Sequence, residues 1–157
     1  MKIHNYSLTN TWTGNYGAGT SSYKSYERAY TIAVKGKPDL LATSAPAFRG
    51  DIEKHNPEEL FLASISGCHM LWFLHLCSVS GVNVVSYKDE ATGKMEENKD
   101  GSGKFTEVLL QPAVIVADIS MIEKANELHA EANKKCFIAN SCNFPIRHLP
   151  NTSVSIL

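Results

Sequence analysis

The stretch from Asn56 to Gly81 constrains the fold more than any other part of the chain, because its pattern is typical of one long helix. Asn56 is a favourable N-cap, Pro57 suits the first helical turn, and Glu59 stands where a capping-box carboxylate is expected. Gly81 can adopt the left-handed conformation that ends many helices. We therefore predict a helix that begins after Asn56 and stops before Gly81.

The body of this helix is apolar on all sides instead of along one stripe. Its apolar residues are Leu60, Phe61, Leu62, Ile65, Met70, Leu71, Trp72, Phe73, Leu74, Leu76 and Val79. Such a helix is expected to be buried on every side. Serines and histidines interrupt the apolar body, which disfavours a membrane span.

The composition is that of an ordinary globular protein, with 43% hydrophobic and 20% charged residues in a chain of 157. We expect a single domain over residues 1–157. The net charge is −1, from 15 basic and 16 acidic side chains, so nucleic acid and anionic membranes are disfavoured as partners. The N-terminus lacks the apolar core of a signal peptide, so we expect a cytoplasmic location, where thiols stay reduced.

The segments around the long helix alternate between strand and helix patterns. We predict strands at residues 2–13, 23–34, 40–43, 82–90, 94–98, 105–118 and 154–157, and a second helix from Met121 to about Cys136. Pro112 lies inside one predicted strand and favours an edge position or a bulge. The order predicts an α+β fold in which antiparallel sheets wrap around buried helices.

Four cysteines are present, and none of their spacings predicts a structural disulfide. Cys68 and Cys77 lie on one helix, about 180° apart and about 13–14 Å along its axis, so they cannot be bridged. The spacing of Cys136 and Cys142 does not match a paired C-x-x-C redox or zinc motif.

Cys68 is the cysteine most indicative of function. Ser66 and Gly67 beside it leave space for another group, and Cys136 ends the second helix, which must pack on the first. Two cysteines on packed helices can form a reversible pair, in which one thiolate attacks and the other resolves. The alternative is that Cys68 is a small buried hydrophobe.

Two further alternatives involve the histidines. A zinc site could use the residue types found at Cys68, His69, His75, His129 and Cys136. His69 and His75 are six residues apart, however, whereas zinc ligands on one helix are favoured at a spacing of three or four residues. We expect His75 to form a hydrogen bond in the core. The other alternative is a cysteine hydrolase, in which His129 or His69 would act as the general base. Only the composition of the chain supports this alternative.

The motif Asn56-Pro57-Glu58-Glu59-Leu60-Phe61, followed by Cys68 and then by His129, Cys136 and Ile138-Ala139-Asn140, resembles the OsmC/Ohr family. These osmotically induced and organic-hydroperoxide-resistance proteins are thiol-dependent peroxidases, and the resemblance spans nearly the whole chain. It implies an OsmC-like fold in an intertwined homodimer, with antiparallel sheets from both chains around long central helices. It implies no cofactor and no metal.

The resemblance also assigns roles to residues. It implies that Cys68 is the peroxidatic cysteine and that Cys136 is the resolving cysteine. It also implies that Glu58 pairs with an arginine that stabilises the Cys68 thiolate. The N-terminal loop that carries this arginine in the family has Lys24 here, which lacks a planar fork. We expect Arg49, in the loop before the long helix, to act in its place, and rank Arg28 second.

Helix geometry adds a constraint on that site. Glu58 and Cys68 are ten residues apart, hence about 15 Å along a straight helix. Direct contact between them is not expected, so an arginine must bridge them or a partner chain must supply one of the groups. This favours a site built by a dimer.

The expected reaction is the reduction of an organic hydroperoxide to an alcohol, with a thiol or dithiol as external reductant. Leu71, Trp72, Phe61 and Phe137 are expected to line an apolar approach to Cys68. We expect Cys77 to be inert packing. Cys142 is close enough to Cys136 in the sequence to compete as resolver, and the sequence leaves open whether it does. The alternative function is a non-catalytic OsmC-like dimer that senses redox state or binds a small apolar ligand.

Overall fold

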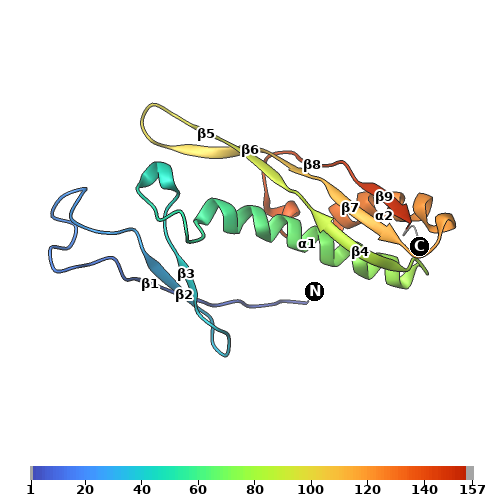
Figure 1. Ribbon diagram of the computed structural model, residues 1–157, viewed down its shortest axis with the longest axis horizontal. Helices are drawn as coiled ribbons and strands as arrows, with labels where there is room; N and C mark the ends of the chain where they lie inside the picture. Colours follow the sequence, from blue (N-terminus) through green and yellow to red (C-terminus); the bar gives the residue numbers. More distant parts are fainter. Residues whose placement is uncertain (1, 155–157) are drawn as a thin grey trace. The chain divides into compact units, whose positions relative to one another are not determined.

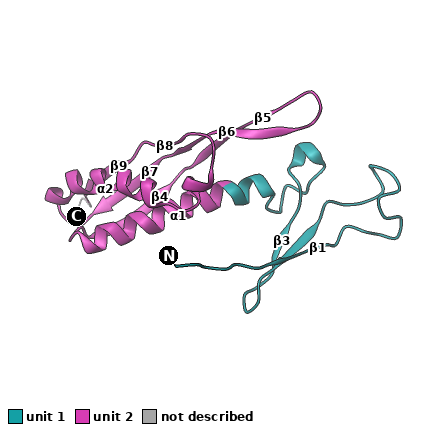
Figure 2. Cartoon of the chain, turned by 180° about the vertical axis from the view of Figure 1, so that it is seen from behind, with its two compact units in different colours: residues 1–61 teal, residues 62–157 magenta. Residues whose placement is uncertain are grey.

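The computed structural model describes residues 2–154 and has an α+β architecture, as the sequence predicts (Figure 1). The chain divides into two compact units, Met1–Phe61 and Leu62–Leu157 (Figure 2). The boundary falls inside the continuous helix α1, Pro57–Val79, so the expectation of a single domain stays a prediction.

Unit 1 contains a three-stranded antiparallel sheet, in the order β1-β2-β3. Its strands are β1 (Thr9–Trp12), β2 (Tyr30–Ala33) and β3 (Leu40–Ala42), and a short 3-10 helix, η1 (Pro46–Phe48), follows. All side chains of β1 are exposed and those of β2 are half-buried. The sheet therefore has almost no core of its own within the described chain.

The first two strands are shorter than the predicted ranges 2–13 and 23–34. The intervening chain instead forms loops that side chains hold in place. The Asn15 side chain accepts hydrogen bonds from the amides of Gly17 and Gly19, and the Trp12 indole donates to the carbonyl of Glu27 at 2.9 Å. These local bonds replace the ladder that a longer hairpin would need.

Helix α1 begins and ends as predicted. The Glu59 amide donates to the Asn56 side-chain oxygen at 2.9 Å, and the Asn56 amide donates to the Glu59 carboxylate at 3.3 Å, which is a complete capping box. Gly81 has a φ of 75° and closes the helix in the left-handed region.

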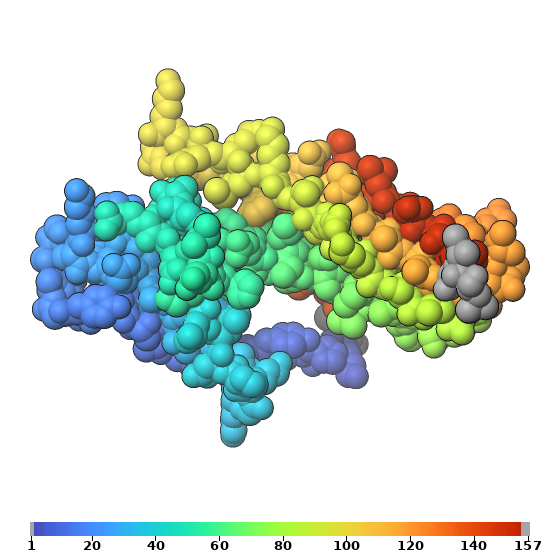
Figure 3. Space-filling model, viewed as in Figure 1, coloured from blue at the N-terminus to red at the C-terminus, as the bar shows by residue number. Residues whose placement is uncertain are grey.

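The expectation that α1 is buried on every side is wrong for the described chain. One line of side chains is fully buried, namely Ile65, His69, Phe73 and Cys77. Leu71 and Val79 are 65% and 66% exposed, because the chain's own elements cover only one face of the helix. Atoms of α1, in green, form part of the surface in Figure 3. The helix is also long and apolar enough to cross a membrane, as core helices of many soluble proteins are.

Unit 2 is built on two three-stranded mixed sheets, β4-β7-β9 and β5-β6-β8. The pairs β4·β7 and β5·β6 are antiparallel, whereas β7·β9 and β6·β8 are parallel. The strands are β4 (Val84–Asp89), β5 (Thr92–Glu97), β6 (Gly103–Leu110), β7 (Pro112–Val116), β8 (Ile146–His148) and β9 (Asn151–Val154). The predicted last strand, 154–157, lies outside the described residues except for Val154.

Pro112 does not lie at an edge, contrary to one prediction. It begins β7, the central strand of its sheet, after the ladder breaks at Gln111. A proline is tolerated at the first residue of a strand, where its missing amide costs least.

Helix α2 (Ile122–Lys135) matches the predicted second helix and follows a 3-10 turn, η2 (Ile119–Met121). The core of unit 2 lies between α1, α2 and the β4-β7-β9 sheet. It consists of Phe73, Cys77, Val82, Val114, Val116, Ala125, Leu128 and Ala132. This packing holds the two helices, and the residues at their ends and midpoints, in fixed positions.

Candidate active site

Cys68 and Cys136, the two cysteines that the sequence singles out, are brought together. Cys68 lies at mid-length of α1 and is half-buried, whereas Cys136 is the C-cap of α2 and is fully buried. A hydrogen bond joins the two thiols, and both are free. The Ala139 amide, at the start of the 3-10 turn η3 (Ala139–Ser141), donates to the Cys136 sulfur at 3.4 Å.

The surroundings keep Cys136 protonated at neutral pH. Burial raises the pKa of the Cys136 thiol to about 11, and the hydrogen bond with Cys68 acts in the same direction. The Ala139 amide opposes both effects, because it stabilises the thiolate. Cys68 is therefore the accessible sulfur of the pair, and Cys136 is the sheltered one.

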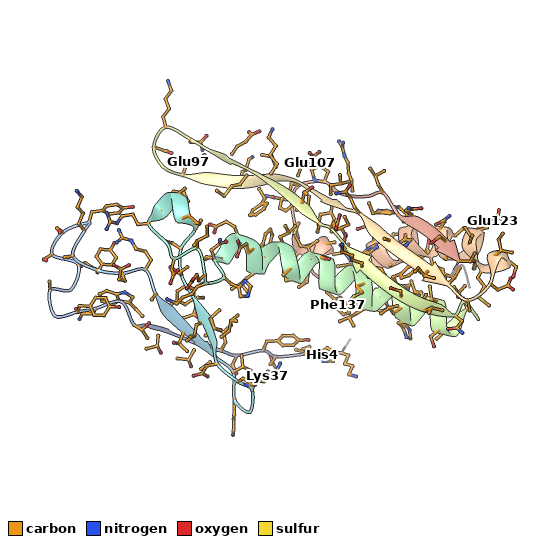
Figure 4. The ribbon with its side chains drawn as sticks, viewed as in Figure 1. His4, Lys37, Glu97, Glu107, Glu123 and Phe137 are labelled. Carbon is orange, nitrogen blue, oxygen red and sulfur yellow. The ribbon has the colours of Figure 1, made fainter. Side chains whose placement is uncertain are left out.

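An apolar cavity of about 610 Å³ opens beside Cys68. It is lined by Ser64, Cys68, Leu71, Trp72, His75, Phe137 and Ile138. The rings of Trp72 and Phe137 meet edge to face, with centroids 5.7 Å apart; Phe137 is labelled in Figure 4. Of the four residues predicted to line an apolar approach to Cys68, three line this cavity, namely Leu71, Trp72 and Phe137. The fourth, Phe61, belongs to unit 1.

His75 is not the core residue that we expected. It is exposed and lies on the wall of the cavity, edge-on to Trp72 with ring centroids 5.7 Å apart. The reason is helical phase: His75 follows Cys68 by seven residues, which returns it to nearly the same face. That face borders the cavity instead of the core.

Three histidines form a cluster that sequence reasoning missed. His69 on α1 and His129 on α2 are fully buried, with His69 Nε2 3.1 Å from His129 Nδ1, and His148 on β8 lies beside both rings. One ring of the bonded pair must donate and the other accept. Helical spacing could have indicated that His69 is buried, because His69 lies four residues from both Ile65 and Phe73 and shares their buried face.

Burial lowers the pKa of His69 to about 4 and of His129 to about 3, and the neighbouring histidines add to both shifts. Asp89 acts weakly in the opposite direction on His69. Both rings are thus neutral at physiological pH. Within residues 2–154, no group of three or more His, Cys, Asp or Glu residues is arranged to hold a metal ion, so the zinc set is not assembled.

Glu58 and Arg49 belong to unit 1, whereas both cysteines belong to unit 2. A carboxylate oxygen of Glu58 is buried and accepts no hydrogen bond from the described chain. Arg49 adopts a φ of 66°, and its guanidinium lies 5.8 Å from the Tyr23 ring centroid without an ion pair among the described residues. Both groups are therefore free to bind something further.

Arg28, the second choice, is already engaged. Its guanidinium lies 4.4 Å and 4.1 Å from the ring centroids of Tyr23 and Tyr26. It also donates to the main-chain carbonyls of both tyrosines. Arg28 therefore holds a loop of unit 1 in place.

A family model described as OsmC-like protein matches residues 50–148, well over half of the chain. The chain belongs to the OsmC/Ohr family. The matched range includes Glu58, Cys68 and Cys136, and no curated protein matches the chain.

Solved structures agree with this assignment. An OsmC-like protein of unknown function from Vibrio cholerae is 29% identical, with a TM-score of 0.86 over 95% of this chain and 100% of that one. Organic hydroperoxide resistance proteins from Elizabethkingia anophelis and Legionella pneumophila are 20% and 17% identical. Their TM-scores are 0.68 and 0.66, over 99% and 98% of this chain and all of each neighbour. Membership of the family supports a peroxide-related redox role for this OsmC-like protein.

Proposed function

We propose that this OsmC-like protein is a thiol-dependent peroxidase that reduces organic hydroperoxides to alcohols. The observation that carries the proposal is the hydrogen-bonded pair of Cys68 and Cys136 beside an apolar cavity of about 610 Å³. Such a cavity accommodates an alkyl or aryl group next to a sulfur nucleophile.

The reaction has three balanced steps. The Cys68 thiolate attacks the terminal peroxide oxygen, the O–O bond breaks, and the leaving alkoxide takes up a proton to become the alcohol. Cys136 then attacks the sulfenic acid on Cys68, which releases water and forms a disulfide. An external thiol or dithiol supplies two electrons and two protons, which restore both thiols.

Glu58 and Arg49 are proposed to favour the thiolate form of Cys68. A planar guanidinium can bind a carboxylate on one side and a developing thiolate on the other. Two observations on residues 2–154 support this role: a buried oxygen of Glu58 has no hydrogen-bond partner there, and the Arg49 guanidinium contacts the Tyr23 ring but forms no ion pair. Glu58 would orient Arg49, and Arg49 would supply the positive charge at the sulfur.

The proposed assembly is a homodimer that acts in the cytoplasm, with no nucleic acid or membrane as partner. Exposed apolar side chains on α1 and the almost coreless sheet of unit 1 support a second copy of the chain as partner. Both surfaces would otherwise leave apolar groups in water.

The test is steady-state consumption of cumene hydroperoxide with dithiothreitol as reductant. Cys68→Ser is expected to abolish turnover, whereas Cys77→Ser, which alters another cysteine of the same helix, should retain it. Burial raises the pKa of Cys77 to about 11, so this thiol is a matched, unreactive control. Unchanged turnover in Cys68→Ser would contradict the proposal.

The resolving step is tested separately. Cys136→Ser is expected to trap Cys68 as a sulfenic acid, detectable with a dimedone probe. Cys142 lies near the same turn, where its thiol donates to the Ile138 carbonyl at 3.3 Å. Normal cycling in Cys136→Ser together with a loss of cycling in Cys142→Ser would transfer the resolving role to Cys142.

The second candidate is a non-catalytic OsmC-like dimer that binds a small apolar ligand or senses redox state. The predominantly apolar lining of the cavity favours it. It predicts ligand binding without oxidation of Cys68 by a stoichiometric amount of hydroperoxide. Oxidation of Cys68 followed by slow or absent turnover would identify a sensor.

A further inference from the structure

Cys142 has no assigned role in the proposed reaction, although it lies close to Cys136 on the turn that follows α2. Its half-buried thiol donates a hydrogen bond to the Ile138 carbonyl at 3.3 Å. The Ala139 amide donates a hydrogen bond to the Cys136 sulfur at 3.4 Å. The Ile138 carbonyl and the Ala139 amide are the two ends of one peptide unit, so this single peptide connects the two sulfurs.

The orientation of this peptide keeps the two sulfurs apart. It is a trans peptide, in which the C=O and N–H bonds point in opposite directions. Cys142 therefore lies on the carbonyl side of the peptide and Cys136 on the amide side. The sulfurs cannot approach to a disulfide bond length of about 2 Å while both hydrogen bonds are kept. In this conformation Cys142 can support Cys136 but cannot form a disulfide with it.

Cys142 also helps to fix the position of this peptide. A carbonyl oxygen has two lone pairs, and the Ile138 oxygen accepts one hydrogen bond from the Ser141 amide at 3.0 Å and a second from the Cys142 thiol. The Cys142 amide in turn donates to the Ala139 carbonyl at 3.1 Å. Cys142 thus makes two hydrogen bonds to the short segment that presents the Ala139 amide.

These hydrogen bonds act on the step in which the disulfide closes. Closure needs Cys136 as a thiolate, and Cys136 is fully buried, where a negative charge is costly. The Ala139 amide lowers the pKa of the Cys136 thiol, because it stabilises the thiolate. A donor on the carbonyl of the same peptide polarises that peptide and strengthens its N–H as a donor.

We propose that Cys142 is a positioning residue of the resolving step. Its thiol holds the Ile138–Ala139 peptide so that the Ala139 amide faces the Cys136 sulfur and stabilises the thiolate that attacks Cys68. This inference rests on the proposed function and deepens it. In this role Cys142 forms no disulfide and exchanges no electrons, which distinguishes it from a competing resolver.

The test follows disulfide closure without a hydroperoxide, so that it does not depend on peroxidase activity. The reduced protein reacts with one equivalent of dithiodipyridine, whose S–S bond the Cys68 thiolate cleaves to give a mixed disulfide. The Cys136 thiolate then attacks the Cys68 sulfur, the pyridinethiolate leaves, and the proton of Cys136 passes to the buffer. Peptide mass spectrometry of acid-quenched samples measures the mixed disulfide and the Cys68–Cys136 disulfide over time.

Four variants distinguish the hydrogen-bond donor from the sulfur. Cys142→Ala and Cys142→Val remove the donor, with and without loss of side-chain volume, and should slow closure about fivefold. Cys142→Ser keeps a donor, and a hydroxyl donates more strongly than a thiol, so closure should equal or exceed the wild-type rate. Ser141→Ala is the matched control. It removes a hydrogen bond of 2.8 Å to the Phe137 carbonyl on the same turn and should leave the rate unchanged.

Urea unfolding curves confirm that each variant is folded at the temperature of the assay. Wild-type closure rates in both Cys142→Ala and Cys142→Val would overturn the inference. Closure as slow in Cys142→Ser as in Cys142→Ala would also overturn it, because the sulfur itself would then be required, and so would the absence of closure in the wild type. The predicted order of rates in a protein that consumes no hydroperoxide would support this inference and contradict the peroxidase proposal.

Discussion

At the residue scale, Cys136 differs from Cys68 in exposure and in the groups around it. The Cys136 thiol is held protonated by burial, with its pKa raised to about 11. Disulfide closure requires it to lose that proton, because the thiolate is the attacking species. Closure of the disulfide, in contrast to attack on the peroxide, is therefore expected to be slow at neutral pH.

The closure rate should rise with pH over the range in which Cys136 is mostly protonated, by about tenfold per pH unit when no base assists. It can be followed by stopped-flow tryptophan fluorescence after one equivalent of hydroperoxide, since Trp72 lies at the same cavity as Cys68. The Cys136→Ser variant, in which closure is blocked, provides the baseline. A closure rate that does not change with pH would show that another group removes the proton.

The two arginines of unit 1 should respond differently to substitution. Arg49→Ala is expected to lower the rate of Cys68 oxidation by about 10²-fold, as the loss of a charged stabilising group does in other active sites. Arg49→Lys should recover little of it. Arg28→Ala should mainly lower stability, because Arg28 stacks on Tyr23 and Tyr26 and holds their carbonyls.

Rates of sulfenic acid formation and urea unfolding curves measure the two effects separately. The assignment fails if Arg28→Ala removes the activity of a still-folded protein while Arg49→Ala does not.

At the scale of elements, the contact between α1 and α2 contains histidines that resist protonation. The groups that face the pair are His148 from β8 and Asp89 from β4. Burial lowers the pKa of His69 to about 4 and of His129 to about 3, from about 6.5 in an unfolded chain. Protonation therefore favours the unfolded state. Their contribution to stability is complete above about pH 6.5 and is lost as the pH falls toward the folded values.

The free energy of unfolding, measured with urea, should fall from about pH 7 to about pH 5. The slope should be smaller in His129→Gln, which removes one buried titrating group, and unchanged in His75→Gln, which alters an exposed histidine. Equal slopes in His129→Gln and wild type would refute the assignment.

Some features of these elements were predictable from the sequence, because they depend on residues that are close to one another along the chain. The ends of α1 followed from Asn56, Glu59 and Gly81, whose side-chain or backbone preferences act within a few residues. The approach of Cys136 to Cys68 followed from the need of a second apolar stripe to pack on the first. Strand lengths in unit 1 did not follow, because side-chain hydrogen bonds such as those of Asn15 compete with the ladder.

Other features depend on packing that no local pattern encodes. The exposed face of α1 was not predictable, because the sequence of an apolar helix does not indicate whether its own chain or another chain covers it. For the same reason His75 was placed in the core, although it lines a cavity. The engagement of Arg28 with two tyrosines depends on a loop conformation, and its sequence neighbours alone did not reveal it.

At the scale of the whole molecule, the exposed apolar surface predicts a homodimer. A three-stranded sheet without a hydrophobic face is marginal by itself, and β1 has no buried side chain. Sedimentation equilibrium should therefore give twice the mass of the chain at micromolar concentration. Val79→Glu, which puts a charge on the exposed face of α1, should shift the equilibrium toward monomer. A monomeric wild-type protein would contradict this prediction.

The proposed function requires that Cys68 reacts with a hydroperoxide and that Cys136 then forms a disulfide with it. The most direct measurement is peptide mass spectrometry of the reduced protein after one equivalent of cumene hydroperoxide, with free thiols alkylated under denaturing conditions. We predict a disulfide that links the peptides of Cys68 and Cys136, with Cys77 and Cys142 recovered as alkylated thiols. Recovery of Cys68 as an alkylated thiol, after the hydroperoxide has had time to react, would show that Cys68 is not the peroxidatic cysteine.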